Sequence, residues 1–214
     1  MRVWDISPGY LSRTSLLGEH RELHGLISIH INQKKGYSRH PETMRWTNTL
    51  GALAFRHELL VAEMRLRGYK HHSPLSIAPG TTDFPPYIDA PAKQISLLCA
   101  KYDGKQQGRT PLPRDKQELW QHHCYSVLAR SEDTFLELER NKEQFSFGRL
   151  AEKLVEILRQ PPGKTEFHKA VALLGGLSPD QQRATTFLGE MSYWMKDKEY
   201  SNTPVAAAFS RSMQ

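Results

Sequence analysis

The sequence predicts an all-α protein, mainly helical, with one compact helical domain, long loops and added C-terminal helices. In most segments apolar residues recur every three or four positions, which is the spacing of one helix face. Residues that start and stop helices bracket many of these segments. The alternation that is typical of strands is weak throughout the chain.

The first 13 residues are expected to form an arm with a short turn, because Ser7 is a good N-cap and Pro8 suits the first helical position. A helix is predicted from about residue 14, and it is expected to end at Gly36. Its apolar stripe is Leu16, Leu23, Ile27 and Ile31.

A polar and basic connector is expected over 37–47, and a second helix over 48–67. The stripe of that helix is Leu50, Leu53, Leu60 and Met64, and Gly68 terminates it. Five prolines then make 70–91 a long irregular segment, and loops of that length are often functional.

The pattern over 92–101 fits either a short helix or a strand, and a loop follows over 103–113. The remaining helices are predicted over 114–130, 133–144, 147–160, 165–174 and 179–196. The last of them is announced by Ser178-Pro179-Asp180-Gln181, which has capping-box spacing. The tail from Ser201 is expected to fray.

Composition narrows the class of protein. A net charge of +6 and a pI near 9.3 favour a polyanionic partner, though only mildly. No apolar run approaches the roughly 20 residues that span a membrane, and the N-terminus has no signal-peptide pattern, so a cytoplasmic location is expected. Cys99 and Cys124 are expected to be buried, reduced thiols.

Two stretches carry a resemblance. The first has Met1-Arg2 at the terminus and LGEHREL at 17–23, and the second is RHELLVAEMRLRGY at 56–69. Together they resemble the pyrimidine-dimer DNA glycosylase family, the phage-type endonuclease V. In that family an arginine follows the first residue, a helix carries Glu-x-Arg-Glu-Leu, and a second helix ends in Ala-Glu-x-x-x-Arg-Gly-aromatic. This chain resembles a longer, bacterial-type member.

The resemblance implies roles for single residues. The nucleophile of the family, the α-amine of the first mature residue, corresponds to Met1, and the catalytic carboxylate corresponds to Glu22. The substrate-binding arginines correspond to Arg2 and Arg21. A further arginine of the family falls on Gly25 here, which puts the identity of the lesion in doubt.

These residue types suit glycosylase and lyase chemistry. A terminal amine has a pKa near 8, and the charges of Arg2 and Arg21 would lower it further. The amine attacks C1′ of the sugar, the base leaves, and an imine links protein to DNA. Glu22 can then remove the C2′ proton, and the strand breaks by β-elimination.

The predicted function is therefore a DNA repair glycosylase with abasic-site lyase activity, acting on a pyrimidine dimer or related lesion. The expected partner is double-stranded DNA with a lesion or abasic site. The protein is expected to be a monomer associated with the nucleoid, to bind no membrane, and to need no cofactor or metal. The predicted DNA-binding residues are Arg2, Arg21, Lys34, Lys35, Arg39 and Arg45. Tyr37 and Trp46 either stack on bases or pack inward.

We divide the chain into a glycosylase-like domain at 1–145 and a C-terminal helical extension at 146–214 that packs on it as part of one unit.

Two other functions stay open. His20 and His24 are four residues apart on one helix face, a spacing that suits a metal-dependent hydrolase with Glu22 as ligand or base. Further histidines could complete that site: His57, His71, His72, His122 and His123. The other alternative is a non-catalytic, basic DNA-binding protein.

Overall fold

The computed structural model describes residues 2–201, which fold entirely into helices and connecting loops, with no strand among them. The all-α prediction is therefore confirmed. The α-helices are α1 (Arg13–Ile31), α2 (Pro41–Arg45), α3 (Leu50–Leu66), α4 (Pro91–Lys101), α5 (Lys116–Leu128), α6 (Glu132–Asn141), α7 (Phe147–Leu158), α8 (Lys164–Gly175), α9 (Pro179–Ala184), α10 (Phe187–Trp194) and α11 (Lys198–Ser201). Two 3-10 turns, η1 (Pro8–Tyr10) and η2 (Lys142–Gln144), join them.

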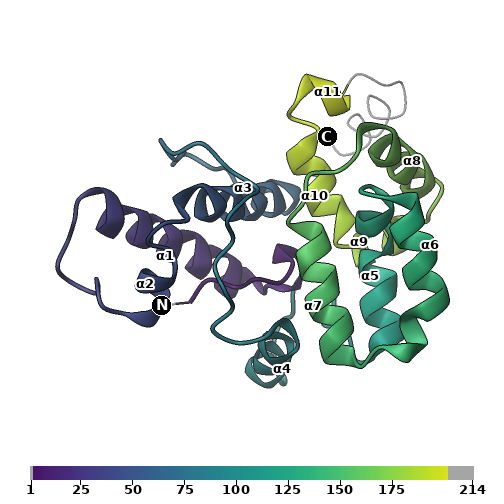
Figure 1. The fold of residues 1–214 in the computed structure, drawn as a ribbon, viewed down its shortest axis with the longest axis horizontal. Coiled ribbons are helices and arrows are strands. Elements are labelled where there is room, and N and C mark those ends of the chain that lie inside the picture. Colours follow the sequence, from purple (N-terminus) through teal and green to yellow (C-terminus); the bar gives the residue numbers. More distant parts are fainter. Residues whose placement is uncertain (1, 202–214) are drawn as a thin grey trace.

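The helices are arranged in two lobes (Figure 1). One lobe holds α1, α2 and α3, and the other holds α5, α6, α8 and α9. Helix α10 lies between them and packs against both α3 and α5, while α7 packs against α4 and α5. The lobes are therefore joined by packed helices.

The hydrophobic core forms two clusters that do not follow the expected boundary at residue 145. The larger one runs from Val3 in the arm to Val155 in α7. The smaller one lies between α5, α8 and α10 and already includes Leu128. The division at 145 stays a prediction, because both clusters draw on residues from both sides of it.

The N-terminal arm is built into the larger cluster. Ser7 caps η1 as expected, and its hydroxyl accepts a hydrogen bond from the backbone N–H of Gly9. The fully buried Tyr10 places its hydroxyl 3.1 Å from Nδ1 of His122 and 3.0 Å from Nε2 of His123. Nδ1 of that second histidine lies 2.9 Å from the Thr186 hydroxyl. Side chains of the arm, α5 and the α9–α10 junction thus meet inside the molecule.

Helix α1 ends five residues earlier than expected, at Ile31 rather than at Gly36. Gln33 adopts the left-handed conformation, with φ at +49°, and the N–H of Lys34 bonds to the carbonyl of Ile29. This is the hydrogen bond of a Schellman motif, in which glutamine occupies the position that usually holds glycine. The predicted end was wrong because it was placed at the first glycine after the helix.

The connector at 37–47 contains a short helix that was not predicted, α2. His40 caps it, since its Nδ1 accepts the N–H of Glu42, and Pro41 occupies the first position. Residues 92–101, which were left open between helix and strand, form α4. The loops at 70–90 and 103–113 are confirmed.

The helix predicted over 179–196 is divided into α9 and α10. The capping box at Ser178 is present, but Thr185 is extended, with ψ at 147°. The N–H of Thr186 bonds to the carbonyl of His122 in α5, so the chain leaves the helix to reach a neighbouring element. A tertiary contact of this kind leaves no mark in the local pattern.

The loop at 103–113 approaches η1 very closely. A Cβ built on Gly108 would lie 2.3 Å from the carbonyl oxygen of Gly9, so only glycine fits there without movement. The N–H of Thr110 then bonds to that same carbonyl, at 3.0 Å.

Three further sequence predictions concern termini, thiols and membranes. Cys99 and Cys124 are both free, as expected, but the first is exposed and the second half-buried. From residue 2 to residue 201, no helix combines the length and apolar character of a membrane span. The predicted fraying of the tail concerns residues outside the described range, apart from Ser201.

Candidate active site

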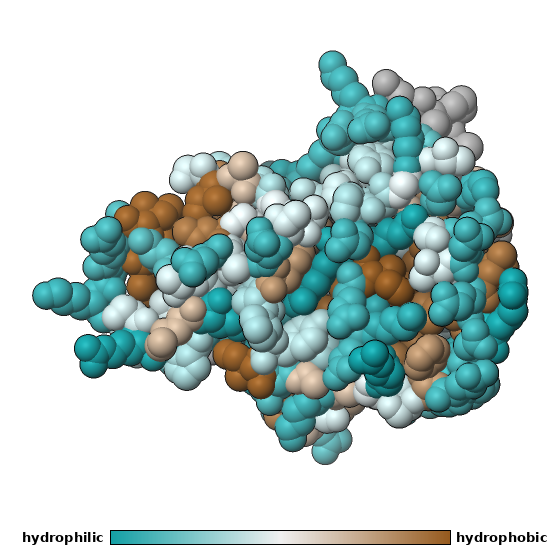
Figure 2. All heavy atoms as spheres, viewed as in Figure 1, coloured by the Kyte–Doolittle hydropathy of each residue, from teal (hydrophilic) through white to brown (hydrophobic). Residues whose placement is uncertain are grey.

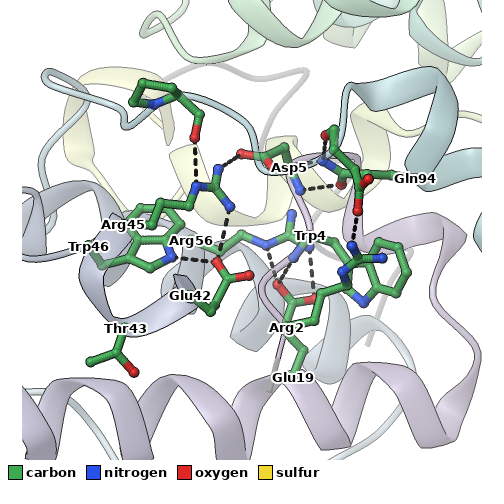
Figure 3. A network of polar contacts seen from close by, with 12 residues as sticks. Arg2, Trp4, Asp5, Glu19, Glu42, Thr43, Arg45, Trp46, Arg56 and Gln94 are labelled. Atoms are coloured by element: carbon green, nitrogen blue, oxygen red, sulfur yellow. Dashed lines mark hydrogen bonds and ion pairs between the residues drawn. The ribbon is translucent and has the colours of Figure 1, made fainter. Parts of the chain in front are cut away.

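The N-terminal arm runs back along α1 towards the C-terminal half of that helix (Figure 1). It is anchored by Glu19, whose carboxylate accepts the backbone N–H of Trp4 at 3.0 Å. Arg56 in α3 donates two bonds to the same carboxylate, at 2.8 and 3.0 Å, and one to the carbonyl of Ile6 (Figure 3). A buried ion pair therefore fixes the direction of the arm between α1 and α3.

Further side chains hold the first residues of the arm. Arg2 forms an ion pair with Asp89 and lies 4.9 Å above the ring of Trp4 (Figure 3). Asp5 accepts bonds from Arg45 and from Gln94. The arm is thus tied to the 70–90 loop and to α4.

Glu22 lies on α1 one turn beyond Glu19 and on the same side of the helix, because residues three apart are neighbours on a helix surface. Its side chain is half-buried, and the adjacent Arg21 is exposed. Met1, the predicted nucleophile, lies outside the described residues. Helix geometry thus places Glu22 near the side of α1 on which Glu19 anchors the arm.

The remaining predicted DNA contacts divide into two groups. Lys34, Lys35 and Arg39 are exposed in the loop between α1 and α2, together with Tyr37, which is 73% exposed. Arg45 differs, because its side chain is 5% exposed and its guanidinium is bonded to Asp5, Glu42 and the carbonyl of Pro86. It braces the arm instead of facing solvent.

Trp46 is 2% exposed and donates its ring N–H to Glu42, at 2.9 Å. Of the two aromatic residues left open, Trp46 packs inward and only Tyr37 is free to stack. The apolar patches on the face shown in Figure 2 are scattered between hydrophilic surface.

The second motif carries a structural ion-pair network. Glu63 is buried and bonds to Arg67, one turn later, and to Arg109 from the 103–113 loop. Burial alone would raise the pKa of Glu63, but the two guanidinium charges outweigh it and hold the pKa below its usual value. Arg67 also donates to the carbonyls of Leu11, Pro8 and Gly9, and therefore fixes η1.

Glu22 does not line the cavity that lies next to the arm. A cavity of about 70 Å³ lies between the arm, α4 and α7, lined by residues such as Trp4, Phe84 and Leu154. Small-molecule sites are usually about 300–1,000 Å³, so this cavity is smaller than a typical ligand site.

Comparison with known proteins supports the resemblance. Residues 1–77 match the family model described as pyrimidine dimer DNA glycosylase. This match covers 77 of the 214 residues, and the matched stretch is called the glycosylase-family region below. No curated protein and no solved structure matches the chain. The glycosylase-family region, residues 1–77, contains the arm and helices α1 to α3.

The glycosylase-family region also contains a cluster of four histidines. His20 and His24 from α1, His57 from α3 and His71 from the following loop place one nitrogen each within 4.8 Å of one another. His72 is exposed, and His122 and His123 lie with Tyr10 elsewhere, so they are not part of it. The expected histidine pair is therefore real, and two of the five suggested partners complete it.

The histidine cluster lies away from Glu22. Successive helix residues are about 100° apart, which places Glu22 roughly opposite both His20 and His24 on α1. The hydrolase alternative, which needs Glu22 as ligand or base beside these histidines, is not favoured by this geometry.

The surroundings favour the neutral form of three imidazoles in the cluster, those of His20, His24 and His71. Burial, together with the neighbouring rings of His57, His24 and His71, lowers the pKa of His20 to about 4. Burial also lowers the pKa of His24 and of His71.

Glu58 faces the outer side of the cluster. The hydrogen bond with His57 lowers the pKa of Glu58 to about 2, and Lys196 reinforces this effect. The carboxylate is therefore ionised and acts only as an acceptor, 3.1 Å from Nδ1 of His57.

Sequence reasoning missed several residues that build the site. Glu19 and Arg56 each lie inside a quoted motif, but nothing local shows that they pair across 37 residues. Asp89 lies in the proline-rich loop and has no motif at all.

Proposed function

We propose that this protein is a DNA glycosylase with associated abasic-site lyase activity, and that the α-amine of Met1 is the nucleophile. The observation that carries the proposal is the direction of the anchored arm. Extended chain advances about 3.3 Å per residue, and Glu22 lies about 4.5 Å along α1 from Glu19, the partner of Trp4. Met1 precedes Trp4 by three residues, and we infer that this length allows its α-amine to reach Glu22.

The chemistry follows from that juxtaposition. The neutral amine attacks C1′ of the damaged nucleotide, the C1′–N bond breaks, and the base leaves with a proton. Loss of the ring oxygen from C1′ opens the sugar and gives an imine. Glu22 then takes the C2′ proton, and the electron pair expels the 3′ phosphate.

The substrate we propose is duplex DNA with a pyrimidine dimer, a related lesion or an abasic site. The exposed cations Arg21, Lys34, Lys35 and Arg39 would contact phosphates. Arg2 and Arg45 act differently in this proposal, because ion pairs with Asp89 and Asp5 engage them and they hold the arm in register. We propose that the protein acts as a monomer on cytoplasmic DNA.

Borohydride trapping tests the nucleophile. Untagged protein is mixed with a duplex that contains one abasic site, reduced, and digested for peptide mass spectrometry. We expect one adduct on the α-amine of Met1, and none in a protein with an N-terminal extension that still binds the duplex. An adduct on a lysine, or full activity of the extended protein, would overturn the assignment. Binding without any adduct would favour the non-catalytic DNA-binding protein.

Glu22→Gln tests the base. It should reduce β-elimination at least about 100-fold, because a positioned general base contributes roughly 10²–10⁴-fold. Binding to the abasic duplex should change little. Glu137→Gln, at an exposed position of α6, is the matched control and should keep the rate. A Glu22→Gln variant that cleaves like the unaltered protein would remove Glu22 from the mechanism.

A further inference from the structure

We propose that His20, His24, His57 and His71 form a site for one divalent transition-metal ion of the zinc type, which clasps three segments of the fold together. The proposal is independent of the lyase chemistry. It changes the expectation of a metal-free protein.

The four rings already surround a common point. Their centroids are 4.8 to 5.2 Å apart in five of the six pairings. Nε2 of His20 lies 3.1 Å from Nε2 of His57, and all four ligand nitrogens fall within 4.8 Å of one another. Four nitrogens bound tetrahedrally at about 2.0–2.1 Å are about 3.4 Å apart, so small side-chain rotations suffice.

The hydrogen-bond pattern aims lone pairs at that point. Glu58 accepts from Nδ1 of His57, so that ring carries a hydrogen on Nδ1, and its Nε2 is the nitrogen that faces the cluster. A carboxylate behind a ligand histidine is the usual outer partner in metal sites. Lys196 holds Glu58 in place, at 2.9 Å.

One nitrogen of the cluster has no hydrogen-bond partner among the described residues. Nε2 of His24 is buried, and among the described residues no donor or acceptor reaches it. Buried polar atoms nearly always have a partner, so an orphan between three other imidazoles points to a ligand. A metal ion would satisfy it.

The donor set indicates the class of ion and its role. Neutral imidazoles suit zinc, copper, nickel and iron, whereas magnesium and calcium prefer oxygen ligands. Four protein ligands close a tetrahedral site, and closed sites are structural rather than catalytic.

The ion would join α1, α3 and the loop that follows α3. This loop contains no helix between Leu66 and Pro91, yet it carries Asp89, the partner of Arg2. His71 is the residue of that loop that enters the cluster. Binding would therefore restrain the segment that holds the start of the arm.

Metal titration of the full chain tests the site. Protein freed of metal with EDTA and dialysed is titrated with Zn²⁺ by calorimetry and with Co²⁺ by visible absorbance, at a pH where histidines are neutral. We expect one equivalent to bind, the absorption bands of tetrahedral cobalt, and a higher melting temperature with zinc. Failure of the unaltered protein to bind either ion would overturn the proposal.

His71→Ala and His24→Ala identify the ligands, since both side chains are only half-buried and the variants are the ones best placed to fold. Each should weaken zinc binding at least tenfold and abolish the tetrahedral cobalt spectrum. Glu58→Gln should weaken binding about 10–100-fold, as outer partners of ligands do. The matched control is His72→Ala, the exposed neighbour of His71, which should bind like the unaltered protein.

If both ligand variants keep stoichiometric zinc and the cobalt spectrum, the four-histidine site is wrong. Imine trapping on the same samples keeps the two proposals apart. Failure of metal binding leaves the Met1 adduct unchanged, and failure of trapping leaves the titration unchanged.

Discussion

Gly25 is the residue at which this chain departs from the family that it resembles. It lies inside α1 on the exposed side of the helix, and a Cβ built there would meet nothing within 4 Å. The Cβ of the family arginine that corresponds to this position would therefore meet no described atom. The glycine thus removes a positive charge from the surface of α1 and does not alter how the helix packs.

We expect Gly25→Arg to strengthen binding to duplex DNA containing a pyrimidine dimer by roughly tenfold at low salt, because a charged hydrogen bond to phosphate contributes about 1.5 kcal/mol or more. Gly18→Arg is the matched control, since that glycine is also in open space and lies seven residues earlier on nearly the same face. Both should stabilise the helix by about 0.5–1 kcal/mol. The measurement is fluorescence anisotropy. Equal gains in affinity for both variants would show that the added positive charge strengthens binding wherever it lies on the helix.

At this scale, sequence reasoning identified the functional candidates better than the residues that hold them. Arg21 and Glu22 were assigned from the resemblance, and both lie on α1, where neither forms an ion pair with another residue that the structure describes. Glu19 and Arg56, in the same two motifs, form the buried pair that orients the arm. A pair between distant segments follows from tertiary structure, which local patterns do not encode.

Among the elements, η1 depends on its neighbours more than on its own sequence. Arg67 bonds to its carbonyls from α3, and Thr110 bonds to it from the 103–113 loop. Gly108 allows this contact, because any side chain there would strike the backbone of Gly9 and Tyr10.

Gly108→Ala should therefore lower the free energy of unfolding by about 1–3 kcal/mol, the usual cost of overpacking, with more where the backbone cannot move. Gly104→Ala serves as a comparison, because that glycine has open space but a φ of +63°, so its cost comes from backbone strain. Urea unfolding followed by circular dichroism measures both. A Gly108→Ala protein as stable as the parent would mean that the loop does not seat on η1.

Helices with strong apolar stripes were predictable, and those shaped by contacts were not. The limits of α3 follow its stripe and Gly68, which adopts a φ of +78° as the sequence implies. Helix α2 was missed because histidine served as its cap. The break before Phe187 was missed because Thr186 leaves the helix to bond with α5.

Viewed as a whole, the molecule does not separate into a family part and an addition. The core cluster that begins in the arm continues through α4, α5 and α7. Asp5 in the arm accepts a hydrogen bond from Arg159, 154 residues later, at 3.0 Å. The residues beyond the glycosylase-family region complete the core that this region requires.

A fragment limited to residues 1–77 should consequently lack a cooperative thermal transition, because it exposes the arm and one side of α3. Circular dichroism melting measures this. Addition of the complementary fragment 78–214 should restore a transition if the missing core is the cause. A cooperative melt of the short fragment alone would show that the glycosylase-family region folds independently.

The hydrogen bonds around Tyr10 fix which atom donates and which accepts in each contact. The hydroxyl of Thr186 donates to the carbonyl of His122, so it accepts from Nδ1 of His123. Burial lowers the pKa of that second histidine to about 3, so its ring is neutral and its Nε2 accepts from Tyr10. Tyr10 in turn accepts from Nδ1 of His122. Two adjacent histidines are thereby both held as Nδ1–H tautomers by hydrogen bonds that link the arm, α5 and Thr186, the residue before α10.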